Sequence, residues 1–223
     1  MPYVKAEEGT QAKSVLYIAD DGSKFLRTGG SRTWRNNNPG NVESKSGFAS
    51  RHGAIGSAGG FAVFPDYETG RSAMSALLHG QRYRRFSIAD AIRAYAPRDR
   101  NDTERLLKLV HKFTALDTDR RLLDLSQREF ENLMDAMAKV EGWREGIEQP
   151  VRRIIGARSD GNRLIAFLIE GGNGYLSKGQ AIALAMQQLI DAVVVRPGGR
   201  DPYLRTSPDQ YAGNTLSTIA ERE

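Results

Sequence analysis

Glu141 ends the segment AMAKVE, which is typical of the last turn of a helix with Phe130, Met134 and Met137 on its apolar face. Glu141 follows Met137 by four positions, so its carboxylate should face the core or a cleft in it. Burial and the helix C-terminus both disfavour a negative charge, which predicts a raised pKa for Glu141. A carboxyl group that stays protonated near neutral pH is what a general acid for glycosidic-bond cleavage requires. The alternative is a side chain that turns past the helix end, into water or onto an arginine.

Two other carboxylates are candidates for the same chemistry. Glu68 stands between Tyr67 and Thr69, where an expected strand ends and an expected helix begins. It is either a second catalytic carboxylate or a favourable charge in the first helical turn. Glu43 is the remaining candidate for the acid.

An unusual density of side-chain amides occurs in the segment RNNNPGN, which contains Asn36, Asn37, Asn38 and Asn41. Amide donors and acceptors beside a rigid Pro-Gly turn suit the hydroxyl and N-acetyl groups of a sugar. The alternative is that these amides cap turns and satisfy backbone groups. The glycine-rich segment GAIGSAGG that follows lets a polymer approach the backbone closely, but it lacks the spacing of a nucleotide-binding loop.

The composition excludes several kinds of site. The 223 residues include no cysteine, which excludes thiol catalysis and zinc–thiolate centres. Three histidines are too few to indicate a His-rich metal site or a Ser-His-Asp triad, so neither a metal nor a cofactor is predicted. The net charge of +5 and the pI near 9.5 suit an anionic partner. Such a partner could be nucleic acid, an acidic membrane face or an acidic cell-wall polymer. Nucleic acid is supported by the pI alone, because a basic helix and an aromatic-basic array are both missing.

The first residues, MPYVKAEEGTQAKS, have no apolar core of the kind that a signal peptide contains. No apolar run approaches the ~20 residues that span a bilayer. We therefore expect a protein that is made in the cytoplasm without a signal peptide and has no membrane span. If it acts outside the cytoplasm, another route must take it there.

The candidate residues require particular elements to position them. Residues 1–30 are expected to form an extended arm with a hairpin over VLYIADDGSKFLR, because two β-rich runs flank an Asp-Asp-Gly-Ser turn. Helices are expected over residues ~69–83, from Ser87 to Pro97, from about residue 101, and from Ser126, where Glu129 completes a capping box. Residues 31–146 would form the main domain. A linker then leads to a small α+β domain over residues 150–223, in the order β-β-α-β.

Four motifs in order resemble a family of phage and secreted bacterial toxin proteins regarded as lysozyme-like peptidoglycan-cleaving enzymes. They are WRNNNPGN, GAIGSAGGFAVFPDYETG, YAPRDRNDT and VEGW, and together they cover roughly residues 30–145. The part after residue 150 is similar to a small domain of unknown function found beside toxin and cell-wall domains.

The resemblance implies an α+β protein with a mainly α lysozyme-like domain, circularly permuted because the acidic helix comes last, and Glu141 as the catalytic acid. The implied substrate is the bond between N-acetylmuramic acid and N-acetylglucosamine. A muramidase uses water, with a second group to position it, whereas in a lytic transglycosylase the sugar's own 6-hydroxyl attacks and one acid/base residue suffices. Tyr67, Tyr95 and the asparagines would orient the N-acetyl sugar. Trp34 and Trp143 would stack on sugar rings, or else pack in the core.

The resemblance also implies a role as an antibacterial effector or a phage lysis protein. Such a protein would act in the periplasm or cell wall of a target cell, after delivery by a secretion machine or during lysis. Its partners would be peptidoglycan, an immunity protein that inhibits it and a carrier on the secretion machine. The rival interpretation is a non-catalytic module that binds the wall and needs no protonated acid.

Overall fold

The structure, a computed structural model, describes residues 1–45, 47–95, 103–161, 163–199, 201–206, 216 and 219–222. The chain divides into two compact units. One, which we term the Glu141 unit, comprises residues 2–7 and 29–146. The other, the C-terminal unit, comprises residue 1, residues 8–28 and residues 147–223. Residues 1–30 are therefore divided between the two units.

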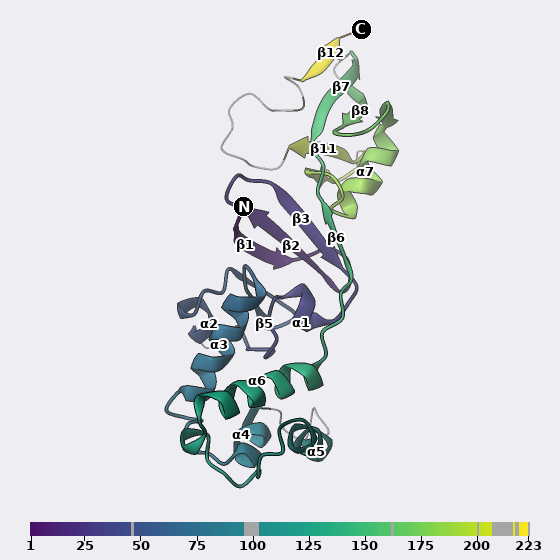
Figure 1. Cartoon of the computed structure of the whole chain (residues 1–223). Coiled ribbons are helices and arrows are strands. Elements are labelled where there is room, and N and C mark those ends of the chain that lie inside the picture. Colours follow the sequence, from purple (N-terminus) through teal and green to yellow (C-terminus); the bar gives the residue numbers. More distant parts are fainter. Residues whose placement is uncertain are drawn as a thin grey trace. The chain divides into compact units, whose positions relative to one another are not determined.

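The Glu141 unit combines a small sheet with helices (Figure 1). Its strands are β1 (Tyr3–Glu8), β4 (Gly56–Ala58) and β5 (Phe61–Val63). Strand β4 lies between the other two, parallel to β1 and antiparallel to β5. The helices are α1 (Arg32–Arg35), α2 (Phe48–Arg51), α3 (Tyr67–His79), α4 (Ile88–Tyr95), α5 (Thr103–Thr114), the 3-10 helix η1 (Leu122–Asp124) and α6 (Gln127–Glu141).

One apolar core holds these helices together. Helix α6 buries residues at spacings of three and four, namely Phe130, Leu133, Met134 and Met137, so one stripe faces the core. The stripe packs in the same cluster as Met74 and Leu78 of α3, Ile88 and Ile92 of α4, and Leu106 and Val110 of α5. The packing fixes the rotation of α6 about its axis, and with it the direction in which Glu141 leaves the helix.

The helix predicted from Ser126 is confirmed. The Ser126 hydroxyl accepts the backbone N–H of Glu129, while the Glu129 carboxylate accepts the backbone N–H of Ser126. The helix ends at Glu141, and Gly142 closes it by donating its N–H to the carbonyl of Ala138. Pro97 and residues 101–102, which were predicted to end one helix and begin the next, lie outside the described residues.

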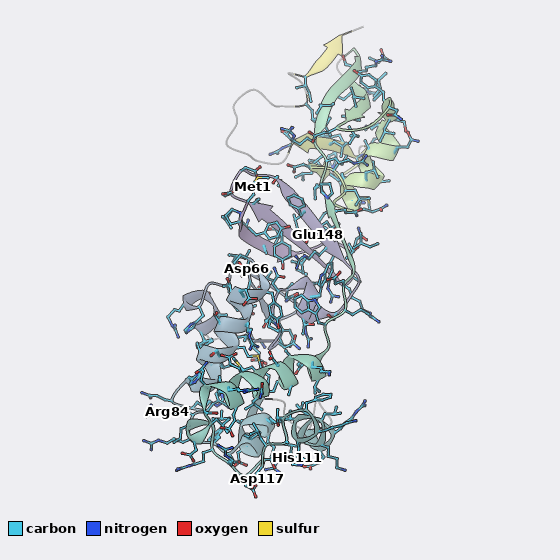
Figure 2. All side chains as sticks on the ribbon, in the orientation of Figure 1. Met1, Asp66, Arg84, His111, Asp117 and Glu148 are labelled. Atoms are coloured by element: carbon cyan, nitrogen blue, oxygen red, sulfur yellow. The ribbon has the colours of Figure 1, made fainter. Side chains whose placement is uncertain are left out.

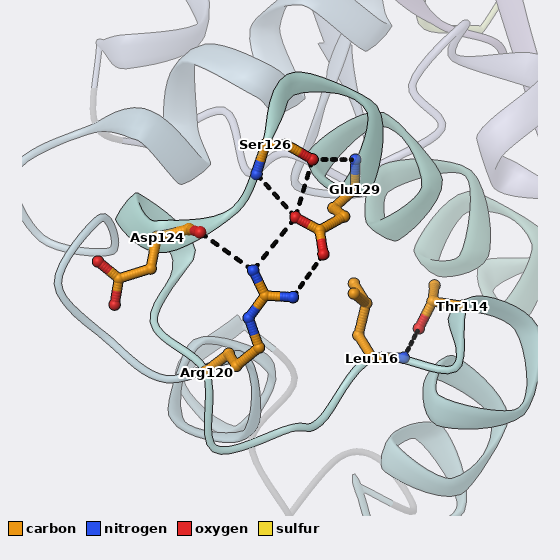
Figure 3. Close-up of polar contacts among 6 residues, drawn as sticks. All are labelled: Thr114, Leu116, Arg120, Asp124, Ser126 and Glu129. Atoms are coloured by element: carbon orange, nitrogen blue, oxygen red, sulfur yellow. Dashed lines mark hydrogen bonds and ion pairs between the residues drawn. The ribbon is translucent and has the colours of Figure 1, made fainter.

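An ion pair reinforces the start of α6 (Figure 3). Arg120 donates from Nη1 to Oε1 of Glu129 at 2.5 Å and from Nη2 to Oε2 at 3.1 Å. A third bond runs from Nη2 to the carbonyl of Asp124 at 3.1 Å. The Arg120 bond and then the bonds from Ser126 hold the pKa of Glu129 at about 2. The stabilisation from this ionised carboxylate is present above the ordinary pKa of glutamate and is lost as the pH falls towards 2.

Replacing Ser126 by Ala is expected to lower the free energy of unfolding by about 1 kcal/mol, because it leaves a helix N–H without its acceptor. Both tryptophans, Trp34 and Trp143, lie in the Glu141 unit, so their fluorescence during urea denaturation reports on that unit. The control is Ser50→Ala, which alters an exposed serine in α2. Equal midpoints for the two variants would mean that the cap contributes nothing.

The C-terminal unit contains two sheets and a hairpin. Strands β2 (Ser14–Ala19), β3 (Lys24–Thr28) and β6 (Ile147–Pro150) pair antiparallel in that order, which confirms the predicted hairpin. Arg27 of β3 forms an ion pair with Glu148 of β6, which Figure 2 labels. The second sheet has the order β12-β7-β8-β9, from β7 (Ile154–Asp160), β8 (Arg163–Ile169), β9 (Tyr175–Ser177) and β12 (Ala220–Arg222). Helix α7 (Lys178–Met186) precedes the hairpin of β10 (Ala192–Val195) and β11 (Tyr203–Thr206).

The chain is α+β, but the predicted mainly α lysozyme-like domain is wrong. The structure is 34% helix and 29% strand, and its N-terminal region is rich in sheet. Strand β1 joins the Glu141 unit by pairing Ala6 with Gly56, so that unit has a sheet drawn from distant segments. Local sequence patterns could not reveal this pairing, because its two strands lie far apart in the chain. The circular permutation was inferred from motif order on the assumption of a lysozyme-like fold, so it is withdrawn together with that fold.

No described helix is long and apolar enough to cross a membrane.

Candidate functional site

The Glu141 carboxylate is half-buried at the end of α6 and does not extend freely into water. Its Oε2 accepts a hydrogen bond of 2.6 Å from Nδ2 of Asn41. Burial raises the pKa of Glu141, while the Asn41 hydrogen bond and the positive charge of Arg32 oppose that rise. The direction predicted from the sequence is therefore confirmed. The carboxyl group keeps its proton to a higher pH than an exposed glutamate does.

Three of the four clustered asparagines have a structural role instead of the predicted sugar contacts. Asn36, Asn37 and Asn38 are buried, with exposed fractions of 1%, 4% and 0%. Each Nδ2 donates to two backbone carbonyls: Asn36 to Ala58 and Ala62, Asn37 to Phe64 and Pro65, and Asn38 to Val42 and Ala62. Buried carbonyls need such donors, because an unsatisfied polar group is costly in the interior. These amides attach the loop to the β4–β5 hairpin.

The loop that these bonds secure presents Asn41 to Glu141. Asn38 pairs with both the N–H and the carbonyl of Val42, and the N–H of Asn41 donates to the carbonyl of Asn38 at 3.0 Å. Asn41 has a φ of 48°, a left-handed conformation that asparagine tolerates better than most residues. The fourth asparagine thus differs from the first three, since its amide faces a carboxylate and not a carbonyl.

Arg32 orients Asn41 from the other side. Its Nε donates to Oδ1 of Asn41 at 2.9 Å. The guanidinium lies over the ring of Phe61, with Cζ 3.7 Å from the ring centroid. Nothing in the sequence indicated this role for Arg32. The segment contains two arginines, Arg32 and Arg35, and no local spacing links either one to Asn41. Its neighbour Arg35 instead donates to the carbonyls of Gly29 and Gly30.

Tyr95 places a buried hydroxyl near the same carboxylate. The residue is half-exposed as a whole, but its Oη is buried and has no hydrogen-bond partner among the described residues. Burial, followed by the charge of Glu141 and an effect of Tyr83, raises the pKa of Tyr95 well above its usual value. A Cβ at Gly40 would lie 2.6 Å from this oxygen, so the turn packs directly on it. Tyr95 therefore remains a neutral hydroxyl beneath the turn that carries Asn41.

Tyr67 and Trp143 form an aromatic corner. Their ring centroids are 5.0 Å apart and the rings are nearly perpendicular, at 87°. Trp143 is 39% exposed, whereas Trp34 is 7% exposed, so only Trp143 of the two can stack on a ligand. The corner belongs to a hollow of about 450 Å³ that is lined by Pro39, Tyr67, Asp135, Ala138, Lys139 and Trp143.

Among the described residues, the side-chain hydrogen-bond partner of Glu141 is Asn41 and neither of the other two candidate carboxylates. Glu68 is exposed in the first turn of α3, which Asp66 caps by accepting the N–H of Thr69 at 2.7 Å (Asp66 is labelled in Figure 2). Glu43 is exposed as well. Neither is among the groups that shift the pKa of Glu141. Glu68 fits the alternative of a favourable charge at a helix start.

Within the part of the chain that the structure describes, no group of three or more His, Asp or Glu side chains is arranged to hold a metal ion. The site brings together the Glu141 carboxyl group, whose pKa is raised, with the Asn41 amide, the Arg32 guanidinium and the Tyr95 hydroxyl. No protein-family model matches the chain, and comparison with the curated proteins finds no significant match.

Proposed function

We propose that the chain cleaves peptidoglycan glycan strands between N-acetylmuramic acid and N-acetylglucosamine, with Glu141 as the general acid. The observation that carries this proposal is the half-buried Glu141 carboxyl group, whose burial raises its pKa. Protonation of the glycosidic oxygen by such a group is the step that a glycosidase must accelerate. The four-motif resemblance described above supports peptidoglycan as the substrate, and the net charge of +5 suits an anionic polymer.

The aromatic corner supports a saccharide as the ligand. A sugar ring has an apolar face of C–H groups that packs against an aromatic ring, and Trp143 and Tyr67 offer two perpendicular faces in one hollow. The same hollow is lined by Ala138 and Lys139 of α6, the helix that ends at Glu141.

A muramidase is the first form of the proposal, and a lytic transglycosylase is the second. Hydrolysis ordinarily uses a second carboxylate to activate water or to act as a nucleophile. Glu68 lies exposed in the first turn of α3, and Glu43 is exposed as well. The reaction in which the substrate's own 6-hydroxyl attacks needs no second carboxylate. In that reaction Glu141 first donates its proton to the leaving oxygen and then accepts one from the attacking hydroxyl.

The biological setting that fits this activity is an antibacterial effector or a phage lysis protein that acts on the cell wall. The resemblance to toxin proteins is its support. An immunity protein would then inhibit the enzyme most directly by covering Glu141 and the aromatic corner.

The test is incubation of the full chain with purified sacculi, followed by mass spectrometry of the released muropeptides. Reducing-end sugars would identify a muramidase and 1,6-anhydro sugars a lytic transglycosylase. Co-sedimentation with sacculi without any release would contradict both forms and would favour the non-catalytic wall-binding module.

A further inference from the structure

Two hydrogen bonds link three side chains from separate segments of the Glu141 unit, namely Arg32, Asn41 and Glu141. Arg32 lies in α1, and Asn41 lies in the turn that follows α1. Glu141 lies at the end of α6, 100 residues after Asn41. The bonds run from Nε of Arg32 to Oδ1 of Asn41 at 2.9 Å, and from Nδ2 of Asn41 to Oε2 of Glu141 at 2.6 Å. Arg32 is exposed as a residue, and its guanidinium also stacks on the ring of Phe61.

Arg32 determines which way the Asn41 amide faces. An arginine Nε can only donate a hydrogen bond, so the amide group that meets it must be the oxygen. The amide nitrogen is then directed at Glu141, and an amide nitrogen can donate but cannot accept. If the Asn41 amide were reversed, its NH2 group would face the N–H of Arg32, and its oxygen would face the carboxylate oxygen of an ionised Glu141. Neither pair could form a hydrogen bond.

We propose that Arg32 and Asn41 are positioning residues that reserve Oε2 of Glu141 as a hydrogen-bond acceptor and leave Oε1 to carry the transferable proton. A neutral carboxyl group has one carbonyl-type oxygen, which accepts well, and one hydroxyl oxygen, which accepts poorly. Because Oε2 always faces a donor, the neutral form is most stable with the hydroxyl at Oε1. The catalytic consequence, proton delivery from Oε1 to the glycosidic oxygen, rests on the proposed function, whereas the arrangement itself does not.

The hydrogen bond from Asn41 and the charge of Arg32 limit how far burial raises the pKa of Glu141. Arg32 approaches the carboxylate from α1, and Tyr95 lies near it from α4, with Tyr83 acting on Tyr95. Of these groups, Tyr95 stays neutral, so Arg32 is the charge that favours the ionised carboxylate. Removing Asn41 or Arg32 should therefore raise the pKa of Glu141 further. A general acid works in its protonated form, so the fall in activity at alkaline pH should move to higher pH.

The test is a ¹³C NMR titration of the glutamate carboxyl signals in the full chain, with Glu141 assigned by the signal that Glu141→Gln removes. The variants are Arg32→Gln, Asn41→Gly and the double variant. Glycine is chosen at position 41 because it accepts the positive φ of 48° that alanine would resist. Arg144→Gln is the matched control, since it removes an exposed positive charge three residues after Glu141 that does not affect the pKa of Glu141.

We expect the titration midpoint of Glu141 to rise in both single variants and to stay unchanged in the control. If Arg32 acts through Asn41, Arg32→Gln should raise the titration midpoint of Glu141 by less in the Asn41→Gly variant than in the unchanged protein. Additive shifts would mean that Arg32 acts only through its charge, and an unchanged midpoint in Asn41→Gly would overturn the proposal outright. This readout needs no substrate, so it succeeds or fails separately from muropeptide release. Where release is observed, Asn41→Gly should lower its rate by about tenfold or more through loss of orientation.

Discussion

Glu141→Gln is expected to lower the rate of muropeptide release by about 10²- to 10⁴-fold, the usual contribution of a general acid. Glutamine has nearly the same shape as glutamate, and its amide oxygen can accept the bond that Asn41 donates. It has no proton acidic enough to transfer to a leaving oxygen. The rates should be measured on the same sacculi over a pH series, because the activity of the unchanged enzyme should fall above the raised pKa of Glu141.

Glu68→Gln and Glu43→Gln are the matched controls, since each removes one exposed carboxylate that does not act on Glu141. Full activity in both would assign the loss to Glu141 alone. Full activity in Glu141→Gln would show that Glu141 is not the general acid. A severe loss in Glu68→Gln would instead restore the second catalytic carboxylate that the sequence suggested.

The same variant makes a separate prediction about stability. Folding raises the pKa of Glu141, so the folded chain binds this proton more tightly than the unfolded chain does. The stability of the unchanged protein is then lost as the pH rises from the ordinary pKa of glutamate through the raised one. Glutamine has no charge to bury, so Glu141→Gln should gain in melting temperature relative to the unchanged protein as the pH rises through this range.

Gly70→Ala is expected to lower the free energy of unfolding by about 3 kcal/mol, at the upper end for overpacking. Gly70 is buried in α3, and a Cβ there would lie 1.9 Å from the backbone carbonyl oxygen of Asn37. The obstacle is backbone that the asparagine bonds hold in place, so it cannot move aside as a flexible side chain would. Displacement of this loop should also draw Asn41 away from Glu141 and reduce activity.

Gly179→Ala is the control for this change. Gly179 also lies in a helix, α7, but a Cβ there would meet nothing within 4 Å. Alanine at such a site should leave stability unchanged or raise it by up to about 1 kcal/mol. Urea denaturation followed by circular dichroism compares the two variants. A Gly70→Ala chain as stable as the unchanged protein would mean that α3 does not press on the loop.

The end of α6 was predictable because its determinants are local. A serine with a glutamate three residues on marks the helix start, apolar residues at helical spacing mark its buried stripe, and Gly142 marks its end. The inward direction of Glu141 and the raised pKa followed from the same spacing. These features depend on neighbours within one or two turns, which the order of residues shows directly.

The role of each asparagine was not predictable in the same way. The four have the same side chain within six positions, but the partners of the first three include carbonyls 22 to 28 residues further on. The partner of Asn41 is a hundred residues away. Nothing local separates an amide that faces a carbonyl from one that faces a carboxylate. Arg32 and strand β1 escaped prediction for the same reason, since their roles depend on contacts across the fold.

The separation of β3 from β6 has a consequence for synthesis on the ribosome. The β2–β3 hairpin can form early, but β6 leaves the ribosome only after the long segment that builds most of the Glu141 unit. At about 5–20 residues per second, roughly 120 intervening residues take about 6 to 24 seconds. During this interval β3 is an open edge, which is a site for pairing with the wrong chain. Arg27, which pairs with Glu148 once β6 is in place, puts a positive charge on β3 during this interval. A charged side chain on an edge strand disfavours pairing with another chain.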